Sequence, residues 1–322
     1  MNILMSYAYS NDLAPWVLDQ MRTNGSRVLI DSGAFTAFSA GVKVSLEGYC
    51  GWLSKHKGTY DEYIALDVIG DHQATQDSYI KMIKMGFNPM GVVIIDDDPN
   101  SARRYVENNP RICVAGGALG QACLPWFPKR MELISRLTEH KAEIHALGFT
   151  PMGWDGKTCA KTVDSSSWKG ARRFGIVNYW YPAARKLERA KWAGLTKDTV
   201  PDYLMRSLRG SQIDIEKCFQ SSRRINRGNI SVTNTISTAS WLIRMVNAEK
   251  VYGQHLYLAG DGQDLFETIA IARHFNVDGS VNYEAVRRER GSFVKECKLR
   301  SRKATRYIQK ALDNYWRVFG EL

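Results

Sequence analysis

Three acidic residues of this sequence, Asp31, Asp67 and Asp164, each follow directly after a short apolar run. Glycines follow two other apolar runs, at Gly116-Gly117 and at Gly148. Carboxylates transfer protons and attack electron-poor carbon, and glycines let the backbone approach a flat ligand closely. If the apolar runs are parallel strands of one sheet, these groups converge at one edge although they lie far apart in the sequence.

Converging carboxylates suit the cleavage of a bond between a sugar and a base. One carboxylate attacks C1′ or stabilises an oxocarbenium-like sugar, and another moves a proton on the base. An aspartate that faces a purine accepts paired N–H bonds, which selects a guanine-like edge. Each aspartate also has a simpler interpretation, because Asp before Ser or a turn often caps a helix. For Asp164, in Asp-Ser-Ser-Ser, capping is the stronger interpretation of that segment alone.

Short β-rich runs alternate with amphipathic segments through the first half of the chain, a pattern typical of parallel strands covered by helices. The sequence predicts an α/β fold, a (β/α)8 TIM-like barrel, with an open doubly wound sheet as the alternative. Helices are expected at Asp77–Met85, Ser101–Asn108 and Lys129–His140. Nine strands are expected, so one lies outside an eight-stranded ring: Ile3–Ser6, Val28–Ile30, Tyr63–Leu66, Val92–Ile95, Ile112–Ala115, Ile144–Leu147, Thr162–Val163, Phe174–Val177 and Leu256–Ala259.

The sequence changes in character near Tyr181, where helical periodicity takes over. Residues 1–180 are expected to form the main part of the barrel. Residues 181–322 are expected to form a basic, mainly helical elaboration that completes it, as one structural unit. Helices are expected at Ala183–Ala193 and Ser237–Lys250, a long basic helix at Phe293–Val318, and an exposed basic loop at Arg223–Asn229.

The net charge of +11 is unevenly distributed. Residues 1–100 hold 7 basic and 12 acidic side chains, whereas residues 161–227 hold 15 basic and 6 acidic ones. Eleven more basic residues lie between positions 287 and 317. Such asymmetry favours a polyanionic partner, a nucleic acid, over a merely soluble basic surface. The residues proposed to contact it are Lys169, Arg172, Arg173, Arg223, Arg224 and Arg227.

Several other features are expected to be structural. The six cysteines are scattered and predict free thiols, with neither a metal site nor a cofactor. His145 is expected to be a buried core residue, and Asp96-Asp97-Asp98 a solvated loop. One or two of Phe35, Trp168, Tyr179, Trp180 and Tyr181 are expected to stack on bases. With no signal peptide and no apolar run of ~20 residues, the expected compartment is the cytoplasm, in the host cell if a phage encodes the chain.

The motifs gain specificity from their order. Asp-Ser-Gly-x-Phe, Ala-Leu-Asp, Gly-Gly-x-x-Gly, a Leu-Gly-Phe strand end and a Val-Asp strand end follow one another between Val28 and Trp168. In this order they resemble the queuine/archaeosine tRNA-guanine transglycosylase superfamily. The resemblance is closest to the short phage and bacterial 7-deazaguanine DNA transglycosylases, the DpdA-like branch. Those enzymes are (β/α)8 barrels that exchange guanine for a 7-deazaguanine through a covalent intermediate.

The resemblance implies a role for each matching position. Asp164 would attack C1′ and Asp31 would be the general acid/base, although the sequence leaves an exchange of their roles open. Asp67 would bind the guanine edge. Ser32, Gly33, Phe35, Gly116, Gly117 and Ala118 would shape the base pocket. The substrates would be DNA and a free 7-deazaguanine such as 7-cyano-7-deazaguanine, with no cofactor.

The sequence also departs from the tRNA enzymes. Ala34 replaces their second glycine, Val68 replaces a common glutamate, and their Cys-x-Cys-x-x-Cys…His zinc subdomain has no counterpart. These departures favour DNA over tRNA as the substrate. The same chemistry on tRNA, a barrel hydrolase that uses water in the second step, and a non-catalytic nucleic-acid-binding barrel remain the alternatives.

Overall fold

A computed structural model describes most of the chain, which forms two compact units. One unit contains residues 2–165 and 253–262, and the other contains Met1 and the described parts of 166–252 and 263–322. The described residues are 1–10, 15–23, 25–169, 175–212, 219, 225–282, 284–286, 288, 308–311, 313–315 and 317–318, the side chains of 118, 120, 121, 225–232 and 263 excepted.

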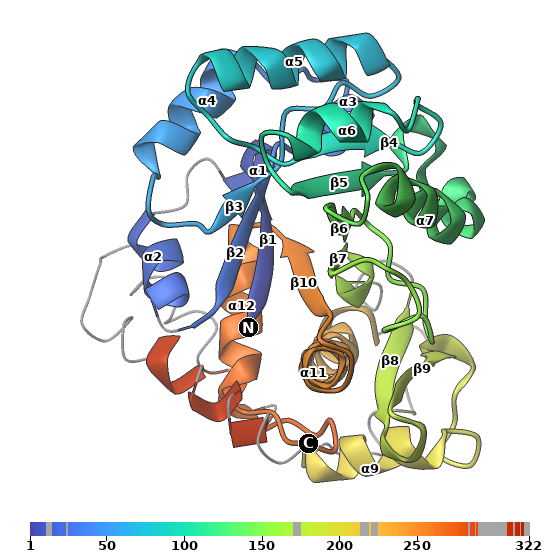
Figure 1. Cartoon of the computed structure of the whole chain (residues 1–322). Coiled ribbons are helices and arrows are strands. Elements are labelled where there is room, and N and C mark those ends of the chain that lie inside the picture. The colour runs from blue at the N-terminus through green and yellow to red at the C-terminus, as the bar shows by residue number, and fades with distance from the viewer. Residues whose placement is uncertain are drawn as a thin grey trace. The chain divides into compact units, whose positions relative to one another are not determined.

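The first unit is built on a curled sheet of eight parallel strands (Figure 1). The strand order is β3-β2-β1-β10-β7-β6-β5-β4, without the reversal of order that defines a doubly wound sheet. A parallel bridge between Ile64 and Met90 joins the two edges, with hydrogen bonds from Met90 N to Tyr63 O and from Ala65 N to Met90 O. The strands are β1 (Asn2–Ser6), β2 (Arg27–Asp31), β3 (Glu62–Tyr63), β4 (Gly91–Ile94), β5 (Arg111–Ala115), β6 (Glu143–Ala146), β7 (Thr162–Ser165) and β10 (His255–Gly260).

Helices connect the successive strands from β1 to β6, and α4 to α7 lie on the outer side of the sheet (Figure 1). Side-chain caps mark the start of α4 and α5. The Ser45 hydroxyl caps α4 by accepting the Gly48 N–H, and the Asp71 carboxylate caps α5 by accepting the Ala74 N–H. The helices are α1 (Tyr7–Ser10), α2 (Pro15–Thr23), α3 (Ala34–Ser39), α4 (Leu46–Lys55), α5 (His72–Lys84), α6 (Ser101–Val106), the 3₁₀ helix η1 (Gly117–Trp126) and α7 (Phe127–Leu137).

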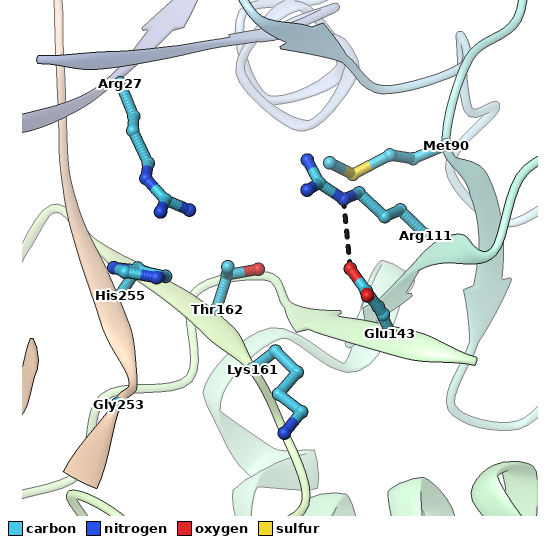
Figure 2. A pocket seen from close by; sticks show the side chains of 8 residues that line it. All are labelled: Arg27, Met90, Arg111, Glu143, Lys161, Thr162, Gly253 and His255. Atoms are coloured by element: carbon cyan, nitrogen blue, oxygen red, sulfur yellow. Dashed lines mark hydrogen bonds and ion pairs between the residues drawn. The ribbon is translucent and has the colours of Figure 1, made fainter. Parts of the chain in front are cut away.

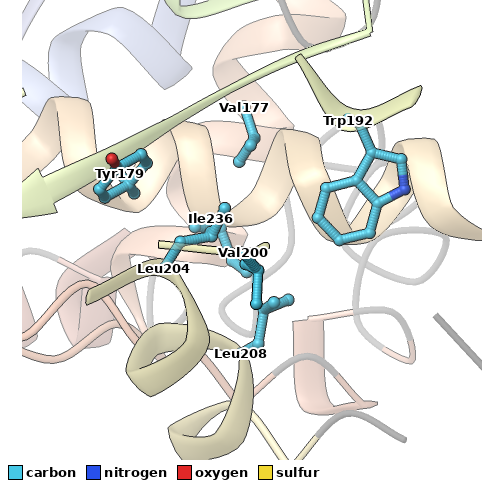
Figure 3. Packing of buried hydrophobic residues seen from close by; sticks show 7 residues of the cluster. All are labelled: Val177, Tyr179, Trp192, Val200, Leu204, Leu208 and Ile236. Carbon is cyan, nitrogen blue, oxygen red and sulfur yellow. The ribbon is translucent and has the colours of Figure 1, made fainter. Parts of the chain in front are cut away.

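The second unit packs an antiparallel hairpin against helices. Its strands are β8 (Ile176–Tyr181) and β9 (Lys186–Lys191), and serine hydroxyls of α11 accept N–H groups of β8, Ser237 from Asn178 and Ser240 from Trp180. An apolar cluster fills the space under the hairpin (Figure 3): Val177, Tyr179, Trp192, Val200, Leu204, Leu208 and Ile236. The other elements are η2 (Ser167–Lys169), η3 (Pro182–Ala184), η4 (Trp192–Gly194), α9 (Asp202–Gly210), α11 (Ile225–Tyr252) and α12 (Gly262–Ala272).

The predicted parallel α/β architecture is confirmed, and the structure is consistent with a TIM-like fold. Leu256–Ala259 enters the sheet as part of β10, and Phe174–Val177 overlaps β8, the strand that lies outside it. The predicted helix at Ala183–Ala193 is wrong. Arg185 turns the chain with a left-handed φ of 47°, and the next residues form β9, because pairing with β8 outweighs helix propensity.

Two predictions concern the basic segments. The predicted loop at Arg223–Asn229 is wrong from Ile225 onward, because those residues begin α11. Arg223 and Arg224 lie outside the described residues. Most of the predicted helix Phe293–Val318 also lies outside them, while the described residues among 308–318 are helical. None of the described helices is both long and apolar enough to span a membrane.

The contact between β4 and α6 generates a stability prediction. A Cβ added at Gly91 would lie 2.3 Å from the Tyr105 ring, whereas one added at Gly51, on an exposed face of α4, would meet nothing within 4 Å. We expect Gly91→Ala to lower the free energy of unfolding by about 1–3 kcal/mol. Gly51→Ala should raise it by about 0.5–1 kcal/mol, because alanine favours helix. Urea unfolding measures both, and a neutral Gly91→Ala would contradict the packing described.

Candidate active site

Asp31, Asp67 and Asp164 meet at the carboxyl edge of the curled sheet. Asp31 ends β2, Asp164 lies in β7, and Asp67 follows β3. Their proximity appears in the electrostatics of Cys113, a buried residue of β5. Burial raises the pKa of this thiol well above its usual value, and the carboxylates of Asp164, Asp31 and Asp67 raise it further. The three acids therefore share one interior with a neutral, unreactive thiol.

Burial and two neighbouring acids oppose the ionisation of Asp31. Burial of its carboxyl, followed by the charges of Asp67 and Asp164, raises its pKa from 3.8 to about 7. Hydrogen bonds from the backbone N–H groups of Gly33 and Ser32 act in the opposite direction, and the Gly33 N to Asp31 Oδ2 distance is 3.0 Å. A carboxyl with this pKa exists in both protonation states near neutral pH, which is what a general acid/base requires.

Asp67 is supported from a neighbouring strand end. The Ser32 hydroxyl, which is fully buried, donates to Asp67 Oδ1 over 3.2 Å and accepts the Ala34 N–H. Burial raises the pKa of Asp67, while hydrogen bonds from its own backbone N–H and from Ser32 oppose the shift. Asp67 does not cap the next helix, because Asp71 does. Ser32, one of the residues expected to shape a base pocket, thus holds the Asp67 carboxylate in place.

Asp164 is anchored through its Oδ1 oxygen. Its Oδ1 accepts the Gly148 N–H at 2.6 Å and lies 3.3 Å from His145 Nε2, without the alignment of a hydrogen bond. The other nitrogen of the imidazole, Nδ1, lies 2.8 Å from the Thr162 hydroxyl. The described residues bring no hydrogen-bond donor to Oδ2.

Two glycines are required by close backbone packing around the site. Gly33 has a φ of 77°, and a Cβ there would lie 2.3 Å from Ser6 Oγ and 2.6 Å from Ala8 Cβ. Gly117 has a φ of 55°, and its Cβ would lie 2.5 Å from Ile94 Cγ2. These glycines, with Gly116 and the backbone of Ala118 at the start of η1, set the shape of the strand ends.

The aromatic candidates divide sharply by exposure. Phe35, in α3, is 52% exposed and is available for stacking. Trp168, Tyr179 and Trp180 are buried in the other compact unit, where they serve its core. Tyr181 is half-buried and packs its ring against Tyr203 at 4.6 Å between centroids.

The structure describes only some of the residues that were predicted to contact nucleic acid. The Lys169 ammonium lies 2.7 Å from Asp264 Oδ2 and is mostly buried, so binding a phosphate would require breaking this ion pair. Arg172, Arg173, Arg223 and Arg224 lie outside the described residues. Arg227 lies in α11, and its side chain is not among those described.

The acidic loop at Asp96–Asp98 is held by cationic and basic neighbours. His72 lies 3.4 Å from Asp96 and 3.1 Å from Asp97, and Arg130 donates to the carbonyls of Ile95 and Asp97. Asp96 and Asp98 are exposed, as predicted for a solvated loop. In the described part of the chain, no group of three or more His, Cys, Asp or Glu side chains is arranged to hold a metal ion.

Sequence reasoning missed the environment of Asp164. His145 is buried, as predicted, but it faces a candidate catalytic group instead of apolar side chains alone. The available signal was positional: His145 and Thr162 occupy paired positions of β6 and β7, and Asp164 is two residues further along β7, on the same face. Cys113 and Tyr49, whose hydroxyl donates to Ile64 O, were likewise not identified.

No family model, curated protein or solved structure matches this chain.

The raised pKa of Asp31 predicts the pH dependence of stability. The folded value of about 7 exceeds the ordinary 3.8, so the unfolded chain releases this proton first as the pH rises. Ionisation of Asp31 therefore lowers the free energy of unfolding as the pH rises from about 4 to 7, by up to about 4 kcal/mol. Asp31→Asn should gain stability relative to the wild type across this window, as measured by urea unfolding at each pH.

A second variant, Asp98→Asn, should show the opposite change of stability with pH. The pKa of the exposed Asp98 is lowered by hydrogen bonds from Asn100, so Asp98→Asn should lose stability relative to the wild type as the pH rises through about 4. If the free energies of unfolding of Asp31→Asn and the wild type changed in parallel with pH, the pKa of Asp31 would not be raised in the folded state.

Proposed function

We propose that this protein is a guanine-exchanging transglycosylase that installs a 7-deazaguanine base in DNA. The curled parallel sheet is then the catalytic (β/α)8 barrel, with its active site at the carboxyl ends of the strands, where TIM-like enzymes carry theirs. The observation that supports this best is the cluster of three carboxylates, in which Asp31 has a pKa of about 7 and Asp164 is held through Oδ1 by the Gly148 N–H.

The proposed reaction is a double displacement. Asp164 Oδ2 attacks C1′ of the target nucleotide, and the C1′–N9 bond breaks with its electron pair passing to guanine. Protonated Asp31 gives its proton to the leaving base. After guanine departs, ionised Asp31 removes the N9 proton of the incoming 7-deazaguanine. The new base attacks C1′, the ester bond breaks, and the electron pair returns to Asp164, so the sugar keeps its configuration.

The remaining groups bind and orient. Asp67 accepts N–H groups of the guanine edge, with Ser32 holding its carboxylate in place. Gly116, Gly117 and Ala118 line the base site with backbone, and Phe35 offers an exposed ring for stacking. The target base leaves the DNA stack to reach this site, as for other enzymes that act on bases.

DNA is preferred to tRNA on sequence grounds. The chain lacks the cysteine-rich zinc pattern of the tRNA enzymes and carries a basic second half instead. A protein that binds nucleic acid through such a surface loses affinity steeply as salt rises, for either substrate. Substrate choice is therefore decided by product analysis and not by binding alone.

Trapping of the intermediate tests the proposal. We expect a denaturation-resistant protein–DNA adduct with guanine-containing DNA, and 7-deazaguanine in the DNA digest once 7-cyano-7-deazaguanine is added. Asp164→Ala should abolish the adduct, because it removes the nucleophile. Asp77→Ala, at an exposed position of α5, is the matched control and should retain it. Denaturing gels and nucleoside mass spectrometry give the readouts.

The other outcomes identify the rival functions. Adduct and incorporation with tRNA alone would assign the chain to tRNA modification. Abasic sites formed without added base would indicate a hydrolase. Binding without adduct, incorporation or abasic product on either nucleic acid would contradict the proposal and favour a non-catalytic binding protein.

The contact between His145 and Asp164 predicts that substitutions of His145 slow the first half-reaction, the formation of the adduct. An N–H donor near Oδ1 keeps Oδ2 oriented and stabilises the carboxylate when it leaves. Catalytic hydrogen bonds are often poorly aligned before substrate binds. We expect His145→Ala to slow single-turnover adduct formation by about 10–100-fold, the effect of losing a hydrogen bond to a charged group.

Two conservative variants separate orientation from simple packing. The amide nitrogen of His145→Gln can occupy the position of Nε2, so this variant should retain most of the rate. His145→Asn places its amide near Nδ1, where it faces Thr162 and does not reach Asp164, so it should resemble His145→Ala. Equal rates for the Gln and Ala variants, at equal stability in urea, would exclude the positioning role.

A further inference from the structure

The amino edge of the same sheet, opposite the three aspartates, contains a cavity of about 210 Å³. Its walls come from the first residues of β2, β5, β6, β7 and β10, or from residues just before a strand (Figure 2). The lining residues all belong to the first compact unit: Arg27, Met90, Arg111, Glu143, Lys161, Thr162, Gly253 and His255.

The charges around this cavity do not balance. Arg111 pairs with two carboxylates, those of Glu62 and Glu143. Arg27 and Lys161 form no ion pair with any residue that the structure describes. Counting these five side chains as charged leaves an excess of one positive charge. The nearby carboxylate of Asp61 is engaged by the Val28 N–H and lies 3.9 Å from Arg22.

Arg27 is the cation best placed to bind a ligand. It lies beside the phenol of Tyr257, and burial raises the pKa of that phenol to about 12, so the phenol is neutral at pH 7. In Figure 2, the Arg27 and Arg111 guanidinium groups extend from different walls into the same space, while the Lys161 ammonium points away from it. Two guanidinium groups that face one space, with carboxylates on only one of them, leave room for an anion between them.

The size of the cavity limits what enters. Its volume is several times the ~30 Å³ that one water molecule takes in the liquid. It lies below the ~300–1,000 Å³ of pockets for drug-sized ligands. An oxyanion with a few waters fits these limits, and the planar fork of an arginine matches the oxygens of a phosphate.

We propose that this cavity binds a phosphate group, held mainly by Arg27 with Arg111 on the facing wall. The group is either inorganic phosphate or the phosphate of a nucleotide whose sugar and base stay outside the opening. Bound phosphate neutralises the excess charge and links the amino ends of strands that are far apart in the sequence. The site is independent of the proposed transglycosylase activity.

Thermal unfolding of the full chain in increasing inorganic phosphate, with chloride added to hold the ionic strength constant, tests the proposal. A ligand that binds only the folded state raises the Tm, by about 2–4 °C at ten times its Kd for a protein of this size. We expect a saturable rise for the wild type. Phosphate also stabilises proteins without binding, but that rise does not saturate and is common to all variants.

Variants identify the ligand-binding residue. Arg27→Met keeps the aliphatic stem and should lose the saturable rise, and Arg27→Lys should keep only part of it. Arg104→Met, at an exposed position of α6 in the same unit, is the matched control and should respond like the wild type. Calorimetric titration of wild-type protein with phosphate gives a readout that does not depend on how well the variants fold.

Deoxyguanosine monophosphate and deoxyguanosine complete the test. Saturable stabilisation by the nucleotide at least as strong as that by inorganic phosphate, with none by the nucleoside, would identify a nucleotide phosphate as the ligand. A stronger effect of inorganic phosphate would identify the free ion. Two results would overturn the proposal: no saturable response and no calorimetric signal with either phosphate, or an equal response in the wild type and Arg27→Met.

Discussion

The repulsion between three carboxylates in one buried space governs the architecture around the candidate site. Ionised acids that lie this close and away from water cannot all stay charged without compensating donors. The structure responds in two ways. Asp31 has a pKa of about 7, so it is present in both protonation states near neutral pH, and all three acids accept hydrogen bonds from groups at the strand ends. The result is one carboxyl with a strongly raised pKa beside two that are held by hydrogen bonds.

Two of the backbone N–H groups that donate to these acids come from residues with a positive φ. The N–H groups that serve Asp31 and Asp164 come from Gly33 and Gly148, both with positive φ. At Gly33 the chain also passes so close to Ser6 and Ala8 that no side chain fits. Glycine adopts a positive φ without the steric cost that a Cβ would bring, so the donor geometry at these positions calls for glycine. Neutral Cys113 completes the interior without adding a charge.

The parallel sheet separates charge between its two edges. On β2, Arg27 begins the strand and Asp31 ends it, and on the later strands Arg111 and Lys161 lie at the amino edge while Asp164 lies toward the carboxyl edge. Thr162 and His145 lie between the two edges. Thr162 lines the amino-edge cavity, and its hydroxyl contacts the His145 imidazole, which faces Asp164. One set of strands thus carries an acidic site and a basic cavity on opposite ends.

The sequence by itself determined the alternation of strands and helices, the approximate positions of nine strands, and the acids at strand ends, because buried strands and strand-end turns have local signatures. Which of these strands lies outside the sheet was decided only by the structure. The sequence did not determine that residues 186–191 form a strand, that His145 faces Asp164, or that Ser32 holds Asp67. Only the tertiary structure decided these points. Each depends on a partner far along the chain, and the pKa of Asp31 depends on charges that no local pattern places beside it.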